Sequence, residues 1–138
     1  MRYLGLDLGT RSLGVSISDR SGMLASFYKN ISYGGNYEEL IKVLNEIVET
    51  NNIDCFVLGF PKNMNNSIGE RGEETLKFKN ILEDIFNKPV ILQDERLTTK
   101  LAESVLIQAD MSRKKRKSVI DGVSAVLILQ SYLDRKDK

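Results

Sequence analysis

Three short β-strand patterns follow one another directly at the start of the chain, and they restrict the possible folds more than any later segment. Branched and aliphatic residues predict strands over residues 3–8, 12–19 and 23–29. The tripeptide Gly9-Thr10-Arg11 and the segment 19–22, which ends in Gly22, are typical of turns between such strands. Consecutive strands joined by tight turns predict an antiparallel meander.

The rest of the chain alternates between helical and strand patterns. Asn36 and Glu39 match a capping box before a helix that reaches about residue 51. The elements expected after it are a buried strand at 53–58, a polar loop at 60–72, a helix around 78–85, a strand at 89–92, a helix at 102–109 and a final helix at 118–133. This order predicts one α/β domain over residues 1–138. Its five-stranded mixed sheet would combine a three-strand antiparallel meander with two parallel strands, flanked by helices.

The chain contains no histidine, which narrows the chemistry available to it. Nucleophile systems of the Ser-His or Cys-His type and histidine-ligated zinc sites are therefore excluded. Catalysis would have to rest on carboxylates, lysine, tyrosine or a metal held by oxygen ligands. Carboxylate oxygens favour hard cations such as Mg²⁺ or Mn²⁺.

Composition and apolar patterning indicate a cytoplasmic protein that does not enter membranes. No signal peptide pattern is visible at the N-terminus, and the longest apolar stretch, at 123–129, is too short to span a bilayer. The single cysteine, Cys55, excludes an internal disulfide and fits a reducing compartment. Because Cys55 lies in an apolar run, we expect a buried structural thiol.

Acidic residues occur where three predicted elements approach one edge of the sheet. Asp7 lies near the end of the first strand, Asp94 and Glu95 lie just past the fifth, and Asp121 opens the last helix. Ligands gather at the carboxyl ends of parallel strands, so these acids can converge there. Grouped carboxylates repel one another unless cations bridge them. Two bound cations can activate water and stabilise the leaving oxygen in phosphodiester cleavage.

Each acid also has a purely structural interpretation, and the residues alone leave both open. The side chain of Asp7 could order the turn that follows it. Glu95 could pair with a neighbouring basic residue on the surface. Ser118 and Asp121 match a capping box, with the acid at the third helical position.

Four blocks of this sequence resemble a known family. They are Gly5-Leu6-Asp7-Leu8-Gly9-Thr10 with Leu13-Gly14-Val15, Leu58-Gly59-Phe60-Pro61, Asp94-Glu95-Arg96-Leu97-Thr98-Thr99, and Ile120-Asp121 with the segment 125–133. Together they resemble the YqgF (RuvX) family, the pre-16S rRNA nucleases formerly labelled Holliday junction resolvases, over nearly the whole chain. The block at 94–99 is quite specific, whereas Asp-x-Gly-Thr alone is weak.

This resemblance implies a ribonuclease H-like fold and phosphodiester cleavage assisted by Mg²⁺ or Mn²⁺. It also implies that Asp7, Glu95 and Asp121 are the catalytic and metal-binding acids. The sequence departs from the family in having Ser12 where a basic residue usually precedes the Ile-Gly-Val segment, with Arg11 one place earlier. Ser124 replaces a usual alanine, a change expected to be harmless.

Basic residues are concentrated near the C-terminus. The first 110 residues carry 12 Lys+Arg and 16 Asp+Glu, whereas the last 28 carry 8 and 3. Residues 113–117 form a run of five basic residues. This basic run would flank the carboxylates and is expected to contact phosphates, although a solvated loop is the alternative. The expected nucleic-acid-binding residues are Arg11, Lys62, Arg96, Arg113, Lys114, Lys115, Arg116 and Lys117, with Arg71 in the Asn-rich loop as a weaker candidate.

The expected partner is nucleic acid, with the 5′ region of a pre-16S rRNA ranked ahead of branched DNA. A resolvase normally acts as a dimer, whereas the predicted helices have one apolar face each, so a monomer is expected. Three alternatives remain at this point: a Holliday junction resolvase-like endonuclease, a non-catalytic RNA-binding ribosome-assembly factor, and an ATPase or sugar kinase of the actin and hexokinase type. The last would need a second comparable domain.

Overall fold

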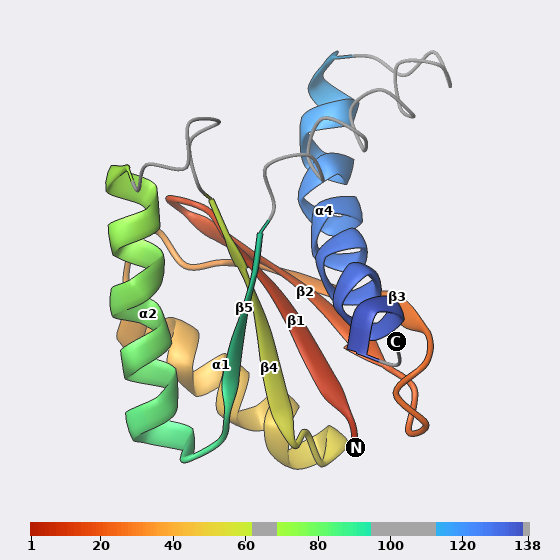
Figure 1. Ribbon diagram of the computed structural model, residues 1–138. Helices are drawn as coiled ribbons and strands as arrows, with labels where there is room; N and C mark the ends of the chain where they lie inside the picture. Colours follow the sequence, from red (N-terminus) through yellow and green to blue (C-terminus); the bar gives the residue numbers. More distant parts are fainter. Residues whose placement is uncertain (62–68, 95–112, 137–138) are drawn as a thin grey trace.

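The computed structural model describes residues 1–61, 69–94 and 113–136, and in the last segment it places side chains from residue 123 onward. Five strands form one sheet in the order β3-β2-β1-β4-β5 (Figure 1). The described elements are β1 (Tyr3–Leu8), β2 (Ser12–Ser18), β3 (Ala25–Ser32), α1 (Tyr37–Asn51), β4 (Cys55–Phe60), α2 (Glu70–Phe86), β5 (Val90–Asp94) and α4 (Arg113–Lys136).

The sheet is mixed, as the sequence predicts. The first three strands form an antiparallel meander, in which Leu6 pairs with Val15 and Val15 with Lys29. The strands β4 and β5 then extend the sheet in parallel on the other side of β1. Each parallel addition requires a crossover, and α1 supplies the one between β3 and β4 while α2 supplies the one between β4 and β5.

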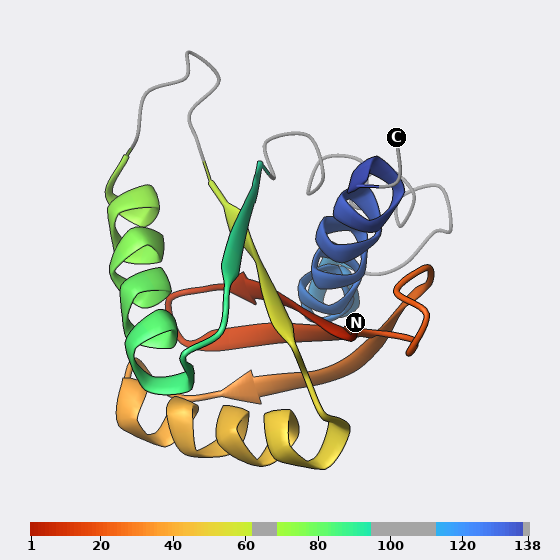
Figure 2. The ribbon, with the colours of Figure 1, turned by 60° about the horizontal axis from the view of Figure 1, so that its bottom comes forward.

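Helices cover both faces of the sheet, as expected from its alternating pattern. Figures 1 and 2 show α1 and α2 on one side of the sheet and α4 on the other. The larger core lies under α1 and α2 and includes Leu4, Leu6, Leu44 and Phe78. A smaller core under α4 consists of Tyr3, Cys55, Val57, Ile128, Leu129 and Leu133. The buried thiol expected at Cys55 is confirmed, and burial raises its pKa to about 11.

The helix α4 packs very closely on the sheet at Gly5. A Cβ atom at this position would overlap the Ser16 hydroxyl and would lie 2.7 Å from the Cβ of Leu129. Real Cβ atoms do not approach this closely, so only glycine allows the helix to sit where it does. The hydroxyl of Ser16 also donates a hydrogen bond to the Ala125 carbonyl oxygen, at 2.7 Å.

Several expected strand boundaries differ from the structure by one to three residues. The third strand extends to Ser32 rather than 29, and the fourth covers Cys55–Phe60 rather than 53–58. Two further differences have an identifiable cause. The third strand begins at Ala25 rather than at 23, because the amides of Met23 and Leu24 donate to the Asp19 carboxylate and remain in the turn. The fifth strand extends to Asp94 rather than ending at 92, because Asp94 pairs with Phe60 in the parallel ladder.

The helix starts also differ from expectation. The helix α2 begins at Glu70, inside the segment expected to be loop. The helix α4 already includes Arg113, five residues before the expected start at Ser118, because lysine and arginine favour helix. The cap expected for α1 is confirmed, with the Asn36 side chain accepting from the Glu38 amide at 3.1 Å. The helix expected at 102–109 lies outside the described residues. In the described part of the chain, no helix combines the length and apolarity needed to cross a membrane.

Candidate active site

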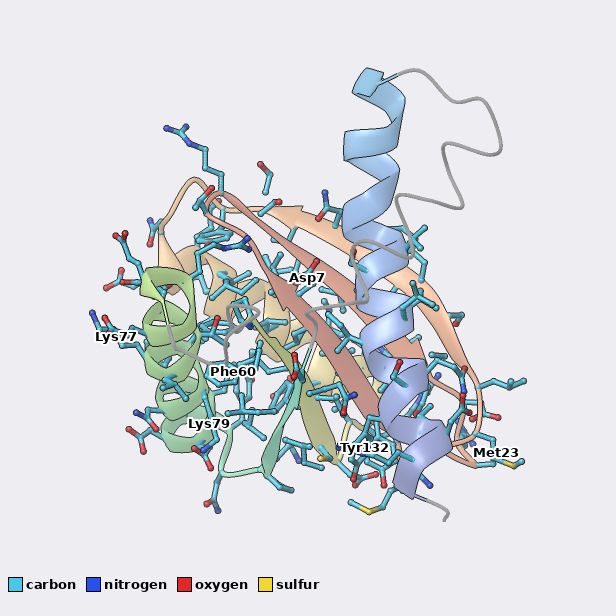
Figure 3. All side chains as sticks on the ribbon, turned by 45° about the horizontal axis from the view of Figure 1, so that its top comes forward. Asp7, Met23, Phe60, Lys77, Lys79 and Tyr132 are labelled. Atoms are coloured by element: carbon cyan, nitrogen blue, oxygen red, sulfur yellow. The ribbon has the colours of Figure 1, made fainter. Side chains whose placement is uncertain are left out.

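The carboxyl ends of the three parallel strands lie together at one edge of the sheet. Asp7 is the next-to-last residue of β1, while Phe60 and Asp94 end β4 and β5 and pair with each other. Figure 3 shows Asp7 on β1, on the side of the sheet that carries α4. Asp7 therefore lies at the edge of the sheet where the acids are predicted to converge.

Side-chain alternation determines which face of the sheet Asp7 shares. Tyr3 packs against α4 and Gly5 lies directly beneath it, so the α4 face of β1 carries every second residue from Tyr3 to Asp7. Asp7 is partly buried there and interacts with other residues of the chain. The opposite face of β1 carries leucines and belongs to the larger core.

Gly59 and Gln93 continue the position of Asp7 across the sheet. Leu6 pairs with Leu58, and continuing that register by one residue sets Asp7 beside Gly59. Gly59 pairs with Gln93 in turn. Gly59 is the middle residue of this row. Because it has no side chain, it does not fill the space between Asp7 and Gln93. The row defines the floor of a candidate site beneath α4.

Two buried oxygen atoms, one of them in this row and one on α4, have no hydrogen-bond partner among the described residues. They are Oε1 of Gln93, on β5, and Oγ of Ser124, on α4. The residues are 9% and 1% exposed, so water does not readily reach them. Buried polar atoms without partners are rare and costly, and they often indicate a functional role. No sequence pattern indicates a role for Gln93, and the change at Ser124 was expected to be harmless.

Asp121 lies within α4, one helical turn before Ala125, and its side chain is not among those described. The capping-box interpretation of Asp121 is wrong, because α4 already includes Arg113 and Ser118 lies in its second turn. Glu95 follows β5 directly but lies outside the described residues. Among the side chains that are described, no group of three acids, cysteines or histidines could hold a metal ion.

The expected phosphate-binding residues fall into three groups. Arg11 is exposed in the turn between β1 and β2, and its carbonyl oxygen accepts from the amides of Tyr33 and Gly34. The basic run forms the first turns of α4 rather than a loop, and its side chains are not described. Lys62 and Arg96 lie outside the described residues.

Arg71 is in a different place from the one expected. It lies in the first turn of α2 rather than in the Asn-rich loop. Its guanidinium donates from Nη2 to the Leu8 carbonyl oxygen, at 3.2 Å, and so links α2 to the end of β1. Its charge therefore lies next to the strand end that carries Asp7.

Comparison with known proteins identifies relatives along the whole chain. A family model described as "RuvX: Holliday junction resolvase" matches residues 1–135. A protein of Geobacillus sp. (strain WCH70) is 53% identical over 137 residues, which cover 99% of both chains. A protein of Bacillus subtilis (strain 168) is 52% identical over 137 residues, covering 97% of this chain and 98% of its own. Both are named "Putative pre-16S rRNA nuclease".

Two solved structures resemble this chain in fold at low sequence identity. The Fowlpox virus resolvase in complex with Holliday junction DNA has a TM-score of 0.58 at 14% identity, over 100% of both chains. The RuvC protein of T. thermophilus in complex with a Holliday junction substrate has a TM-score of 0.54 at 12% identity, over 96% of both. These similarities confirm the expected ribonuclease H-like fold. With the family model and the relatives, they establish that this chain belongs to the RuvX family of nucleases.

Proposed function

We propose that this protein is a metal-dependent nuclease that hydrolyses phosphodiester bonds in the 5′ region of pre-16S rRNA, with Asp7, Glu95 and Asp121 as its catalytic carboxylates. The observation that carries the proposal is the position of Asp7. It lies at the carboxyl edge of the parallel strands, on the face that α4 covers, and β5 ends immediately before Glu95.

The packing of β1 against α4 supports the inclusion of Asp121. The two elements run in opposite directions, since Tyr3 contacts Tyr132 with ring centroids 5.7 Å apart, while Gly5 lies beneath Leu129 and Ala125. Two residues along a strand advance about 6.7 Å, which is close to the roughly 5.4 Å of one helical turn. One further step of this series leads from Gly5 to Asp7 on the strand and from Ala125 to Asp121 on the helix.

The chemistry of the available donors fits a hard divalent cation. The carboxylate of Asp7 and the buried Oε1 of Gln93 are oxygen ligands on the same face of the sheet, and the chain has no histidine. Asp7, Glu95 and Asp121 would hold Mg²⁺ or Mn²⁺. When bound, such a cation supplies an activated water and stabilises charge on the leaving oxygen.

The chain itself contributes rigidity and charge to this reaction. Asp7 pairs with Gly14 of β2, and its neighbour Leu6 pairs with Leu58 of β4, so the position of the Asp7 backbone in the sheet is fixed. We propose that the basic run at the start of α4 contacts the phosphate backbone, with Arg11, Lys62 and Arg96 as further contacts.

The relatives' names favour a precursor of 16S rRNA as substrate. The second candidate is a Holliday junction, which the description of the family model favours. We place the RNA first because the relatives, at 52–53% identity, are closer to this chain than either resolvase structure. We also propose that the protein acts as a cytoplasmic monomer, since paired junction cuts call for a dimer. A non-catalytic RNA-binding factor would not need acids beside a phosphate.

The test offers the purified protein a labelled pre-16S rRNA fragment and a synthetic four-way junction, each with Mg²⁺, Mn²⁺ or EDTA. We expect cation-dependent cleavage of the RNA that Asp7→Asn abolishes. Asp84→Asn, which changes an exposed carboxylate on α2, is the matched control and should cleave normally. Near-normal turnover by Asp7→Asn would remove Asp7 from the site. Symmetric junction cutting without RNA cleavage would favour the second candidate.

A further inference from the structure

A pocket of about 430 Å³ opens at the same edge of the sheet as Asp7 but on the opposite face. Its walls come from the end of β1 and the following turn, from Tyr33 just after β3 and Tyr37 at the start of α1, and from Arg71 and Glu74 on α2. Figure 1 shows that this turn and the start of α2 lie at the same end of the molecule. The volume is within the range of small-molecule binding sites.

Aromatic rings line one side of the pocket and are held in place. The ring centroids of Tyr33 and Tyr37 are 5.8 Å apart, and Tyr37 packs in turn against Phe78 at 5.5 Å. The Tyr33 hydroxyl donates to the Gly9 carbonyl oxygen, at 2.6 Å. Burial, with smaller contributions from Tyr33 and Glu74, raises the pKa of Tyr37 to about 12, so both rings stay neutral at physiological pH. Neutral, fixed rings are suitable surfaces for stacking.

The polar groups of the pocket favour a ligand that donates hydrogen bonds. Glu70 and Glu74 supply two carboxylates, whereas Arg71 is the one cationic side chain among the described residues that line the pocket. The Glu74 carboxylate accepts from the Tyr37 hydroxyl through Oε2 at 3.3 Å and pairs with the exposed Lys77 through Oε1 at 3.6 Å. It is half exposed, and each carboxylate oxygen can accept more than one hydrogen bond, so it retains acceptor capacity. This excess of negative charge would repel a bare phosphate. The same carboxylates can accept hydrogen bonds from the N–H groups of a nucleobase.

The position of the pocket relates it to the reaction. Leu8 and Gly9, which line it, follow Asp7 directly in the chain. One residue of strand advances about 3.3 Å, so the backbone of Leu8 and Gly9 lies roughly 3 to 7 Å beyond that of Asp7. A nucleic acid strand that crosses the edge over the Gly9–Thr10 turn could present a phosphate to one face and a base to the other.

We propose that this pocket binds one unpaired nucleobase carrying an exocyclic amino group, from a nucleotide next to the bond that is cleaved. The base stacks beside Tyr37 and donates its amino hydrogens to Glu74. Unstacked bases that stack on aromatic side chains and bond through their edges are the usual basis of single-stranded RNA recognition. This inference rests on the proposed function. It deepens that function by naming the base that is bound next to the cleaved bond.

The first experiment separates base binding from cleavage. Binding of a short, labelled single-stranded RNA is measured in EDTA, with each position in turn replaced by an abasic nucleotide. In the wild type, one position should weaken binding by roughly 5- to 150-fold when abasic, the range for one stacked base. The variants Tyr37→Leu and Glu74→Gln should bind the intact RNA more weakly and lose sensitivity at that position. Glu49→Gln, an exposed acid of α1 remote from the pocket, is the control.

The second experiment repeats the abasic series in cleavage reactions with Mg²⁺ or Mn²⁺. An abasic nucleotide at the same position should raise the KM of the wild type. A uracil there should raise KM by an intermediate amount because it lacks the amino group. Tolerance of an abasic nucleotide at every position, or unchanged binding by both pocket variants, would overturn the inference. Base-dependent binding in EDTA without any cleavage would support the pocket and count against the proposed nuclease site instead. Circular dichroism identifies a misfolded Tyr37→Leu, and the exposed Glu74→Gln then decides the outcome.

Discussion

Ser16 and Ala125 are joined by a buried hydrogen bond that links the sheet to α4. The hydroxyl of Ser16 donates to the Ala125 carbonyl oxygen at 2.7 Å, and both residues are fully buried. Ala125 lies one turn after Asp121, so this bond helps to determine how far the start of α4 extends over the carboxyl edge of β1.

Removing this bond should lower the stability of the whole domain. We expect Ser16→Ala to reduce the free energy of unfolding by about 1 kcal/mol, the net value of a buried hydrogen bond. Urea unfolding measures the change. Ser26→Ala on the edge strand β3 alters an exposed serine and should change stability by less than about 0.5 kcal/mol. Equal effects of the two substitutions would show that the bond to Ala125 contributes nothing specific.

Because Oε1 of Gln93 is buried, replacing this residue should increase the stability of the fold and weaken cation binding. Without a partner this atom destabilises the fold, so Gln93→Met should raise the free energy of unfolding in EDTA by about 1 kcal/mol. The gain in melting temperature that Mg²⁺ or Mn²⁺ gives the wild type should be smaller in the variant, because an oxygen facing the proposed site is lost.

Gln130 provides the opposite case for comparison. Its side chain bonds to the Ala25 amide and the Met23 carbonyl oxygen, so Gln130→Met should lower stability in EDTA. Destabilisation of Gln93→Met in EDTA, as for Gln130→Met, would mean that the amide of Gln93 is satisfied in solution.

Asp19 should titrate at unusually low pH. Hydrogen bonds from the Ser21 hydroxyl and from the amides of Met23 and Leu24 lower its pKa from 3.8 to about 2. The carboxylate therefore stabilises the turn fully above pH 3.8, and this contribution is lost as the pH falls through about 2. A carboxyl titration by NMR measures the pKa. Ser21→Ala removes the largest cause and should move the pKa back toward 3.8. An ordinary pKa in the wild type would contradict these bonds.

The basic run on α4 should bind nucleic acid without reading its sequence. Replacing Lys114, Lys115, Arg116 and Lys117 by glutamine should weaken binding to all sequences. It should also flatten the dependence of log K on log salt, by about one slope unit per lost phosphate contact. The double variant Lys29→Gln and Lys42→Gln removes two exposed charges, one from β3 and one from α1, and serves as the control. An unchanged salt slope in the four-residue variant would make the run a solvated helix end.

The sequence alone determined the order and type of the described elements, because the signals for them are local. Alternating and continuous apolar runs identified all five strands, and Asn36 identified the start of α1. The same local signals failed where distant residues decide the boundary. Asp94 extends β5 because it pairs with Phe60, and Ser118 resembles a cap although α4 begins before it.

The candidate site divides in the same way. Absence of histidine and the position of Asp7 near a strand end already indicated carboxylate and cation chemistry. Only the tertiary structure revealed that Gln93 shares the face of Asp7, that Ser124 is buried with no partner in the described part of the chain, and that Tyr37 and Glu74 form a pocket with the end of β1. These relationships depend on strand register and helix packing between residues far apart in the chain. No local pattern encodes them, because each is decided by which surfaces bury one another when the sheet and its helices close together.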